Sequence, residues 1–300
     1  MTSRLQSQIR AKKFVMTAEI TPPLSSDTEE LLEKARPLKG LADAVNVTDG
    51  ASARSTMSAL VAAHLLNQNG VEPILQMTCR DRNRIALQSD LVGAAALGIS
   101  NLLILTGDNP KAGDQPDAKP VFDLDSTQIV ATAVSIRDKS ELLHGRKVGG
   151  SATFFVGVPD APVDPKPDWE PKSLLKKLAA GAQFAQTQFC MDVGVARRYL
   201  ARLHELGVPK DFPFLVGVAP LASAKSARWI KENLFGAIVP EEIVARMDAA
   251  SDPRAEGQAI CADLAVALSE IEGVAGVHIM APLNERAIPN VIESVRKRLG

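Results

Sequence analysis

The segment from residue 73 to residue 110 constrains the fold of this chain more than any other. An apolar run that ends at residue 77 is followed by a polar cluster at residues 78–83, a helix-like segment of small residues at 84–97 and a second apolar run at 102–105. This order is strand, loop, helix, strand, with polar side chains gathered where each strand ends. Parallel α/β folds bind ligands at that end of their strands. The segment therefore predicts a binding site at the carboxyl ends of these strands, without yet assigning a role to any residue.

The same alternation continues along the chain. Strands are predicted at residues 14–20, 44–47, 71–77, 102–105, 147–155, 184–187, 214–218 and 276–280. Helices are predicted from residue 26 onward and at residues 54–68, 84–97, 126–143, 172–180, 195–206, 222–232, 241–250, 258–270 and 288–299. Most of these strands are unbroken apolar runs, which is typical of parallel strands buried on both faces.

Eight strand–helix units in 300 residues predict an α/β protein built as a (β/α)8 TIM barrel, with residues 1–300 forming a single catalytic domain. The rival fold is an open, doubly wound sheet. That fold would be favoured by a glycine-rich dinucleotide-binding fingerprint after the first strand, and the sequence has none there.

The composition of the chain excludes several classes of protein and of binding partner. Hydrophobic residues make up 46% of the chain and the net charge is −1, which favours a large core and argues against disorder. No basic block suggests nucleic acid, and no apolar run approaches the roughly 18 residues of a membrane helix. Cys79, Cys190 and Cys261 lie far apart and no histidines have metal spacing, so neither a disulfide framework nor a metal site is expected. We expect a cytoplasmic protein.

Glu19 is the first candidate catalytic residue, because it lies in an apolar strand one residue from the strand's end. A carboxylate is costly to bury there unless it is paired or protonated. Burial would raise its pKa and make it a usable general acid near neutral pH. The alternative is a solvated glutamate paired with a loop lysine.

Further polar residues end other predicted strands: Thr48, Gln76, Thr78, Asp108 and Gln188. Each could simply satisfy loop backbone groups or cap a loop. Their recurrence favours a shared pocket, because all the strand ends of a barrel face one mouth. A carboxylate such as Asp108 can accept two parallel N–H bonds from a guanidine-like ring edge or bind a metal. The Gln188 amide can both donate to and accept from a heterocycle.

Other polar residues of the sequence are explained more readily by a structural role than by catalysis or binding. Residues 81–84 (Asp-Arg-Asn-Arg) are interpreted as a helix cap with ion pairs. Lys176 and Lys177 lie on a predicted helix and would ordinarily be solvated, although one of them could reach a phosphate. A Schiff-base aldolase needs a lysine at a strand end, whereas Lys13 and Lys147 begin predicted strands.

Several segments, taken in order, resemble the methylenetetrahydrofolate reductases, the flavoprotein (β/α)8 barrels of one-carbon metabolism. The segments are residues 18–23 (Ala-Glu-Ile-Thr-Pro-Pro), 47–51 (Val-Thr-Asp-Gly-Ala), 78–83 (Thr-Cys-Arg-Asp-Arg-Asn), 97–99 with 105–108 (Leu-Thr-Gly-Asp), and 180–182 with 187–189 (Thr-Gln-Phe). The similarity covers nearly the whole chain, and the Cys-Arg-Asp-Arg-Asn segment looks most like the short bacterial branch of the family.

The resemblance implies reduction of 5,10-methylenetetrahydrofolate to 5-methyltetrahydrofolate through a flavin, with NADH or NADPH as donor. Glu19 aligns with the family's catalytic glutamate, which would protonate the folate N10. Asp108 aligns with the aspartate beside flavin and pterin, and Gln188 with the pterin-binding glutamine. The expected partners are the folate substrate and further copies of the chain in a homo-oligomer.

The cofactor implied by the resemblance is FAD, with FMN as the alternative. Flavin contacts carry over to Thr48, Gln76, Asp108, Glu170 and Lys177.

This chain also departs from the best-studied bacterial members. Gln76 stands where they have His and Thr106 where they have Arg, while Ser226 and Ile230 replace a helical Gln and Phe that help to hold the nicotinamide. Their Leu-Asn-Arg appears at residues 283–286 as Leu-Asn-Glu-Arg. An alternative function therefore stays open, a flavin-free folate-binding or methyl-transfer accessory protein on the same barrel.

Overall fold

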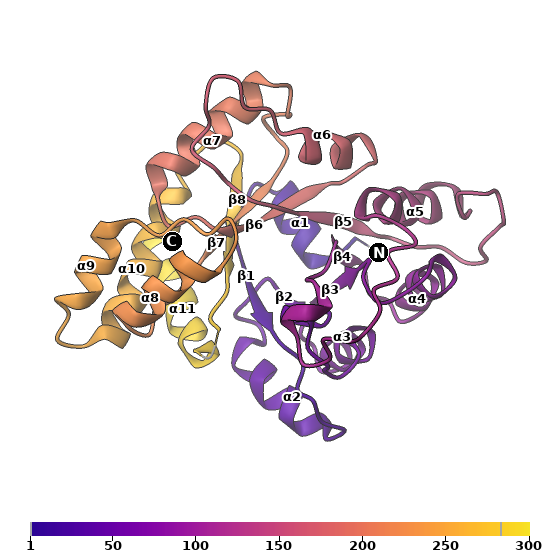
Figure 1. Cartoon of the computed structure of the whole chain (residues 1–300), viewed down its shortest axis with the longest axis horizontal. Helices are drawn as coiled ribbons and strands as arrows, with labels where there is room; N and C mark the ends of the chain where they lie inside the picture. The colour runs from indigo at the N-terminus through magenta and orange to yellow at the C-terminus, as the bar shows by residue number, and fades with distance from the viewer. Residues whose placement is uncertain (1, 283) are drawn as a thin grey trace.

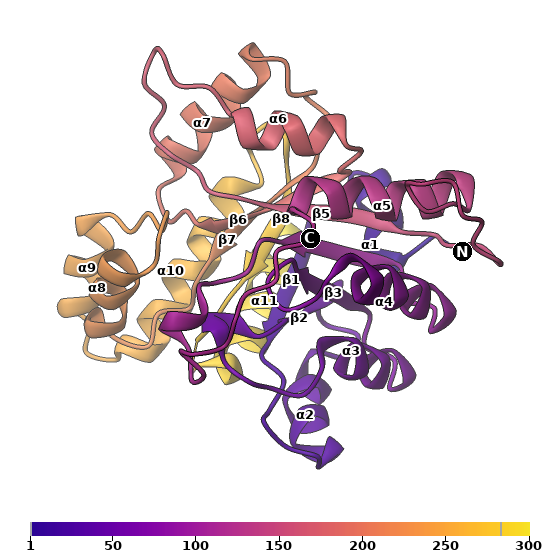
Figure 2. The same cartoon turned by 45° about the vertical axis from the view of Figure 1, so that its right-hand side comes forward.

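Eight parallel strands close into a barrel in chain order in the computed structural model, which describes residues 2–282 and 284–300. The strands are β1 (Val15–Ile20), β2 (Ala44–Val47), β3 (Pro73–Thr78), β4 (Asn101–Leu105), β5 (Phe155–Asp160), β6 (Phe184–Phe189), β7 (Phe214–Val218) and β8 (Val274–Ile279). Figures 1 and 2 show this strand ring at the centre of the molecule with the helices around it. The prediction of a (β/α)8 barrel is confirmed.

The helices follow the strands as a barrel requires. They are α1 (Arg4–Arg10), α2 (Thr28–Ala35), α3 (Ala59–Gln68), α4 (Arg84–Ala96), α5 (Ser126–Lys139), α6 (Lys172–Ala179), α7 (Val193–Glu205), α8 (Ala224–Asn233), α9 (Glu241–Asp248), α10 (Pro253–Leu268) and α11 (Ile288–Leu299). Short 3-10 turns include η2 (Ala51–Ala53) and η3 (Pro110–Ala112). None of these helices in the described ranges is both long and apolar enough to cross a bilayer.

Alternation along each strand divides the core in two. In β1, Met16, Ala18 and Ile20 belong to the large apolar layer between the strand ring and the helices. Successive strand side chains point to opposite faces, so Thr17 and Glu19 point into the barrel. The ring closes where β1 pairs with β8, with Thr17 opposite His278.

The amino-terminal half of the barrel interior is an apolar plug. Its buried members are Leu5, Val15, Ala44, Ile74, Leu103, Phe155, Phe184 and Leu215. The rings of Phe155 and Phe184 stack with centroids 4.6 Å apart. Gly157 makes room for them, because a Cβ there would come within 2.2 Å of the Phe184 ring.

Helix α1 closes this end of the barrel and was not predicted from the sequence. Ser3 caps the helix by accepting from the backbone N–H of Gln6, and Glu72, just before β3, accepts from the backbone N–H groups of Arg4 and Leu5. Leu5 is fully buried. A seven-residue helix is marginal by itself, so burial of Leu5 and these caps must stabilise it.

The fifth strand was wrongly predicted at residues 147–155. The strand is Phe155–Asp160, and the predicted range holds the exposed pair Gly149 and Gly150, the latter with a φ of +80°. Pro159 lies within this strand although proline cannot donate to a ladder. It is tolerated because it lies at the carboxyl end of the strand, where its carbonyl accepts from the Lys177 side chain at 3.1 Å.

The three cysteines are free and buried. Burial raises the pKa of both Cys79 and Cys190 to about 11. These two thiols are therefore protonated at neutral pH and poorly nucleophilic.

Truncation of Leu5 tests whether α1 seals the amino-terminal end of the barrel. We expect Leu5→Ala to lower the free energy of unfolding by about 2–5 kcal/mol, because it leaves a cavity in a fully buried site. Denaturant unfolding followed by circular dichroism measures this loss. Arg10→Ala, on the exposed side of the same helix, is the matched control and should change stability by less than about 0.5 kcal/mol. Equal effects from the two variants would contradict the sealing role.

Candidate active site

Glu19 lies inside the barrel near the carboxyl ends of the strands. Its Oε2 accepts a hydrogen bond from Gln76 Nε2 at 3.1 Å, and His278 Nε2 lies 3.6 Å from the same oxygen. The Glu19 side chain is 26% exposed, whereas His278 is 3% exposed. The carboxyl is thus held by groups from β3 and β8 and still reached by water.

A buried polar network lies on the amino-terminal side of Glu19. Thr17 Oγ1 is 3.0 Å from His278 Nδ1 and accepts from Gln186 Nε2 at 3.4 Å. Gln186 and Asn46 exchange two side-chain hydrogen bonds, of 2.6 and 3.1 Å. The amides therefore have the partners that buried polar groups need.

Sequence analysis did not assign a role to Thr17, Asn46, Gln186 or His278. A signal was present, because each is a polar residue in the middle of a strand that is otherwise buried on both faces. Such a residue must point either into the helix layer, where it would be costly, or into the barrel, where other strands can supply partners. Only closure of the ring shows which partners those are.

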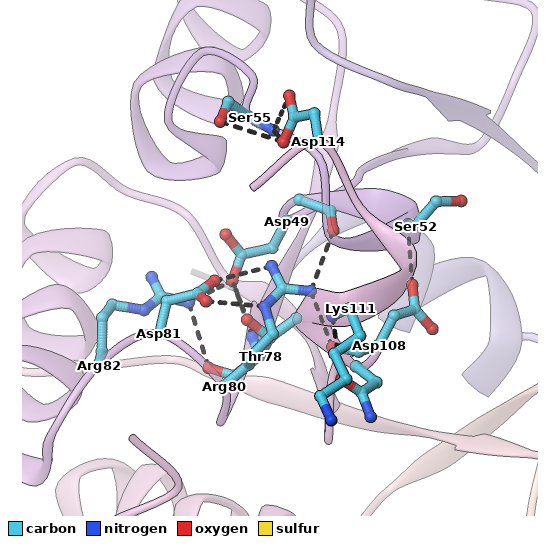
Figure 3. Close-up of polar contacts among 12 residues, drawn as sticks. Asp49, Ser52, Ser55, Thr78, Arg80, Asp81, Arg82, Asp108, Lys111 and Asp114 are labelled. Atoms are coloured by element: carbon cyan, nitrogen blue, oxygen red, sulfur yellow. Dashed lines mark hydrogen bonds and ion pairs between the residues drawn. The ribbon is translucent and has the colours of Figure 1, made fainter. Parts of the chain in front are cut away.

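Asp108 follows β4 at the rim of the barrel, after Gly107. Gly107 has a φ of +93°, and a Cβ there would lie 3.0 Å from Arg80 Cβ, so the backbone approach requires glycine. The Asp108 carboxylate accepts from the backbone N–H of Ser52 at 2.8 Å through Oδ2 (Figure 3). The residue is exposed. Within the described residues, no hydrogen bond joins Asp108 to Glu19.

The loop after β4 packs against the loop after β2 at this rim. Asp114 accepts from the backbone N–H of Ser55 with both oxygens, at 3.1 Å each (Figure 3). Gly113 lies so close to Ala53 that a Cβ would come within 1.8 Å of the Ala53 carbonyl oxygen. Ser52 and Ala53 both adopt a positive φ of 55°, a strained backbone for residues with a side chain.

Arg80 joins three rim segments. It makes two hydrogen bonds of 2.7 Å to the Asp81 carboxylate and donates through Nη1 to the carbonyls of Gly50 at 3.2 Å and Asp108 at 3.3 Å. The hydrogen bond to Asp81 is the main cause that raises the pKa of Arg80. Arg80 is 4% exposed, and its guanidinium makes four hydrogen bonds within the protein.

The prediction for residues 81–84 is confirmed. Asn83 caps α4 by accepting from Ala86 N at 3.1 Å. Arg82 pairs with Asp49 and with Asp90, the latter at 2.8 Å, and Arg84 pairs with Asp123 at 2.8 Å. Asp49 also accepts from the backbone N–H and hydroxyl of Thr78, at 2.8 and 3.0 Å.

Thr48 offers the clearest opening for a ligand. The residue is 2% exposed, and its hydroxyl has no hydrogen-bond partner among residues 2–282 and 284–300. Buried hydroxyls usually have a hydrogen-bond partner. A bound molecule with a polar ring edge could supply the partner that the Thr48 hydroxyl lacks. Gln76, two strand positions from the rim residue Thr78, supplies an amide on the neighbouring strand.

Gln188, near the end of β6, and Lys177, on α6, are engaged by the protein itself. The Gln188 amide accepts from Phe189 N at 3.0 Å and donates to the Phe235 carbonyl at 3.4 Å. Lys177 is buried on α6, where desolvation lowers its pKa and the nearby Asp160 carboxylate partly opposes that shift. Glu170 is exposed ahead of α6 and pairs with Lys172 at 3.5 Å.

Asp160 was not singled out from the sequence. It ends β5, and its carboxylate accepts from the Tyr199 hydroxyl at 2.7 Å. Burial raises the pKa of Asp160, an effect that the Tyr199 hydrogen bond partly offsets.

The departures from the reductase pattern have structural counterparts. Ser223 caps α8 and Ser226 completes a reciprocal capping box with it, and Ile230 is 5% exposed in the core. Thr106 is exposed at the rim, and Leu283 lies outside the described residues. In those described ranges, no three His, Cys, Asp or Glu side chains are grouped to hold a metal ion.

The role of Arg80 in tying the rim can be measured. Arg80→Met should lower the free energy of unfolding by about 2 kcal/mol, because it strips charged hydrogen bonds from two loop carbonyls. Arg54→Met, which changes an exposed arginine of the neighbouring loop between β2 and α3, is the matched control and should be nearly neutral. Hydrogen exchange should also quicken at residues 50–53 and 106–109 in the Arg80 variant alone. Unchanged exchange there would show that the loops do not depend on Arg80.

Comparison with protein families gives a match along almost the entire chain. The profile of a family described as "Methylenetetrahydrofolate reductase" matches residues 4–296. A "5,10-methylenetetrahydrofolate reductase" of Pectobacterium carotovorum subsp. carotovorum is 27% identical over 270 residues, which is 87% of this chain and 83% of that protein.

Two other relatives are longer proteins. A "Probable methylenetetrahydrofolate reductase (NADPH)" of Caenorhabditis elegans is 28% identical over 189 residues, and "Methylenetetrahydrofolate reductase 2" of Schizosaccharomyces pombe is 24% identical over 208 residues. These matches cover 63% and 68% of this chain but only 26% and 32% of the two relatives. Among solved structures, DmoA from Hyphomicrobium sulfonivorans superposes with a TM-score of 0.60 at 11% identity, covering 95% of this chain and 88% of DmoA, a likeness of fold alone.

Proposed function

Because the chain belongs to the methylenetetrahydrofolate reductase family, we propose that it reduces 5,10-methylenetetrahydrofolate to 5-methyltetrahydrofolate, with a flavin and a nicotinamide donor. The observation that carries the proposal is the position of Glu19, a partly exposed carboxyl group held inside the mouth of the barrel. The names of the bacterial and nematode relatives support the reaction, and the nematode name specifies NADPH.

Glu19 serves as the general acid in this proposal. Gln76 and His278 both approach Oε2, and Oε1 has no hydrogen bond to the described part of the chain. Oε1 is therefore the oxygen free to carry a proton to the substrate. Protonation of the folate N10 turns that nitrogen into a leaving group, so the five-membered ring opens and the methylene carbon becomes electrophilic.

Asp108 and Gln188 bind the pterin in this proposal. The pterin has a guanidine-like edge, which matches the two oxygens of a carboxylate. Asp108 uses only Oδ2 to hold Ser52, so Oδ1 remains for a ligand. Gln188 would exchange its contact with the Phe235 carbonyl, which is long at 3.4 Å, for one to the heterocycle.

The residues at the mouth fit a flavin through the unpartnered Thr48 hydroxyl, and Gln76 and Asp108 are further proposed contacts. Lys177 and Glu170, at the two ends of the α6 region, are the proposed contacts to the rest of the cofactor. FAD is the proposed flavin and FMN the alternative. The flavin would supply the two-electron carrier between donor and folate, while the protein binds and orients both.

A second candidate is a flavin-free folate-binding or methyl-transfer accessory protein. It is favoured by α8, where the Ser226 hydroxyl is engaged with Ser223 in the capping box of the helix and Ile230 is buried in the core. Neither position presents an aromatic group or a free amide for a nicotinamide.

The absorbance spectrum of the purified protein separates the two candidates. We expect added FAD to remain bound through gel filtration, and NADH or NADPH to bleach its visible absorbance. Thr48→Val should weaken FAD binding, because it removes the buried hydroxyl; Thr56→Val, in the loop that follows, is the control. A colourless protein that binds tetrahydrofolate in calorimetry without any flavin would favour the accessory function.

Replacement of the acid tests the mechanism. Glu19→Gln should retain flavin and fold normally but reduce folate at least about 100-fold more slowly, the usual range for loss of a general acid. Donor oxidation followed with a flavin-reoxidising dye should persist. Glu33→Gln, an exposed glutamate on α2, is the control. Folate turnover that survives the Glu19 change would remove this residue from the mechanism.

A further inference from the structure

We propose that His278 is a positioning residue for Glu19, fixed by Thr17 in the tautomer that carries its proton on Nε2. In that tautomer the ring presents an N–H group to Oε2 of Glu19 and leaves Oε1 turned toward the substrate. The inference rests on the proposed role of Glu19 as general acid.

The imidazole bridges two inward positions of one strand. Thr17 and Glu19 both point into the barrel from β1, and His278 lies opposite Thr17 in the register of β1 with β8. Nδ1 is 3.0 Å from Thr17 Oγ1 and Nε2 is 3.6 Å from Glu19 Oε2. The ring is 3% exposed, so its orientation is set by these strands.

The hydroxyl of Thr17 decides the tautomer. Gln186 Nε2 donates to Thr17 Oγ1 at 3.4 Å, so the Thr17 oxygen acts as an acceptor in that bond. The one proton of the Thr17 hydroxyl is then available to donate to another group. That proton can go to the Val277 carbonyl at 3.4 Å or to His278 Nδ1 at 3.0 Å, and the shorter contact favours Nδ1. A neutral imidazole that accepts at Nδ1 carries its proton on Nε2.

Gln186 is itself held in place by Asn46. The two amides exchange hydrogen bonds of 2.6 and 3.1 Å, which set the orientation of the Gln186 amide that faces Thr17. The chain of contacts therefore runs from β2 and β6 through Thr17 to His278, and ends at the carboxyl group of Glu19.

Two donors on one carboxylate oxygen restrict rotation of the whole group. Gln76 Nε2 approaches Oε2 from β3 and His278 Nε2 approaches it from β8. A separation of 3.6 Å is longer than a hydrogen bond, and contacts of this kind in free enzymes often shorten when substrate binds. We expect the His278 contact to shorten in the folate complex.

Three substitutions separate positioning from simple packing. In His278→Gln, the longer side chain places an amide N–H near the former Nε2. In His278→Asn, the amide reaches only the former Nδ1 beside Thr17, and His278→Leu has no donor at all. We expect Gln to keep kcat within about threefold, and Asn and Leu to lose about tenfold or more in kcat with little change in KM, as for an interaction made in the transition state.

The outcomes are distinct. Equal kcat values for the Gln and Asn variants, with both folded by thermal unfolding, would reduce His278 to a packing residue and overturn the proposal. A loss in Gln as large as in Leu would also overturn it, since the role would then need an imidazole that exchanges protons.

A second measurement needs no turnover. Nitrogen NMR of the histidine-labelled protein at pH 7.5 should show His278 with Nε2 protonated and Nδ1 bare, and Thr17→Val should convert it to a mixture of tautomers. Wild-type protein with Nδ1 protonated, or with both nitrogens protonated, would overturn the proposal. If the wild type reduced no folate, the proposed function would fail while this spectrum still decided the tautomer of His278.

Discussion

Closure of eight parallel strands into a ring is the constraint on which the rest of this structure depends, because the inside of the ring must be filled by its own side chains. The chain fills it in two halves. The amino-terminal half is apolar, sealed by Leu5 of α1 and the stacked rings of Phe155 and Phe184. The half nearer the mouth is polar, and its buried members supply hydrogen-bond partners to one another.

This division explains why a carboxyl group can stand inside the barrel. An isolated charge in an apolar interior would be costly. Glu19 avoids this cost because its carboxyl accepts a hydrogen bond from the Gln76 amide on β3 and lies close to the His278 imidazole on β8. It also stays partly exposed to water. The apolar floor keeps the network away from the solvent at the other end of the barrel. The polar half can then orient Glu19 while Thr17, Asn46 and Gln186 supply hydrogen-bond partners to one another.

The rim is held by a separate set of interactions. Arg80 binds the carbonyls of Gly50 and Asp108, and the Asp108 carboxylate holds the strained turn at Ser52. A ligand at the mouth must fit against these loops or move them. Around α8, Ser226 and Ile230 serve the fold, Ser226 in the capping box of the helix and Ile230 in the core.

Local patterns in the sequence were enough for the barrel, for the strand ends that carry Glu19, Thr48 and Gln76, and for the ion pairs of residues 81–84. Each of these depends on apolar periodicity or on residues close together in the chain. The fifth strand was misplaced because Pro159 and the prolines that follow it argue locally for a loop, although the buried strand runs over Phe155–Asp160. Helix α1 was missed because seven residues carry too little pattern of their own.

By itself, the sequence determined the number of strands, their order along the chain and the polar residues near the ends of several of them. Tertiary structure alone decided which polar side chains meet inside the barrel. Thr17 and His278 are 261 residues apart, and Asn46 and Gln186 are 140 apart; closure of the ring places the first strand beside the last and lets amides meet across the interior. Such pairings follow from register and from the shape of the closed barrel, and neither can be read from the neighbours of a residue along the chain.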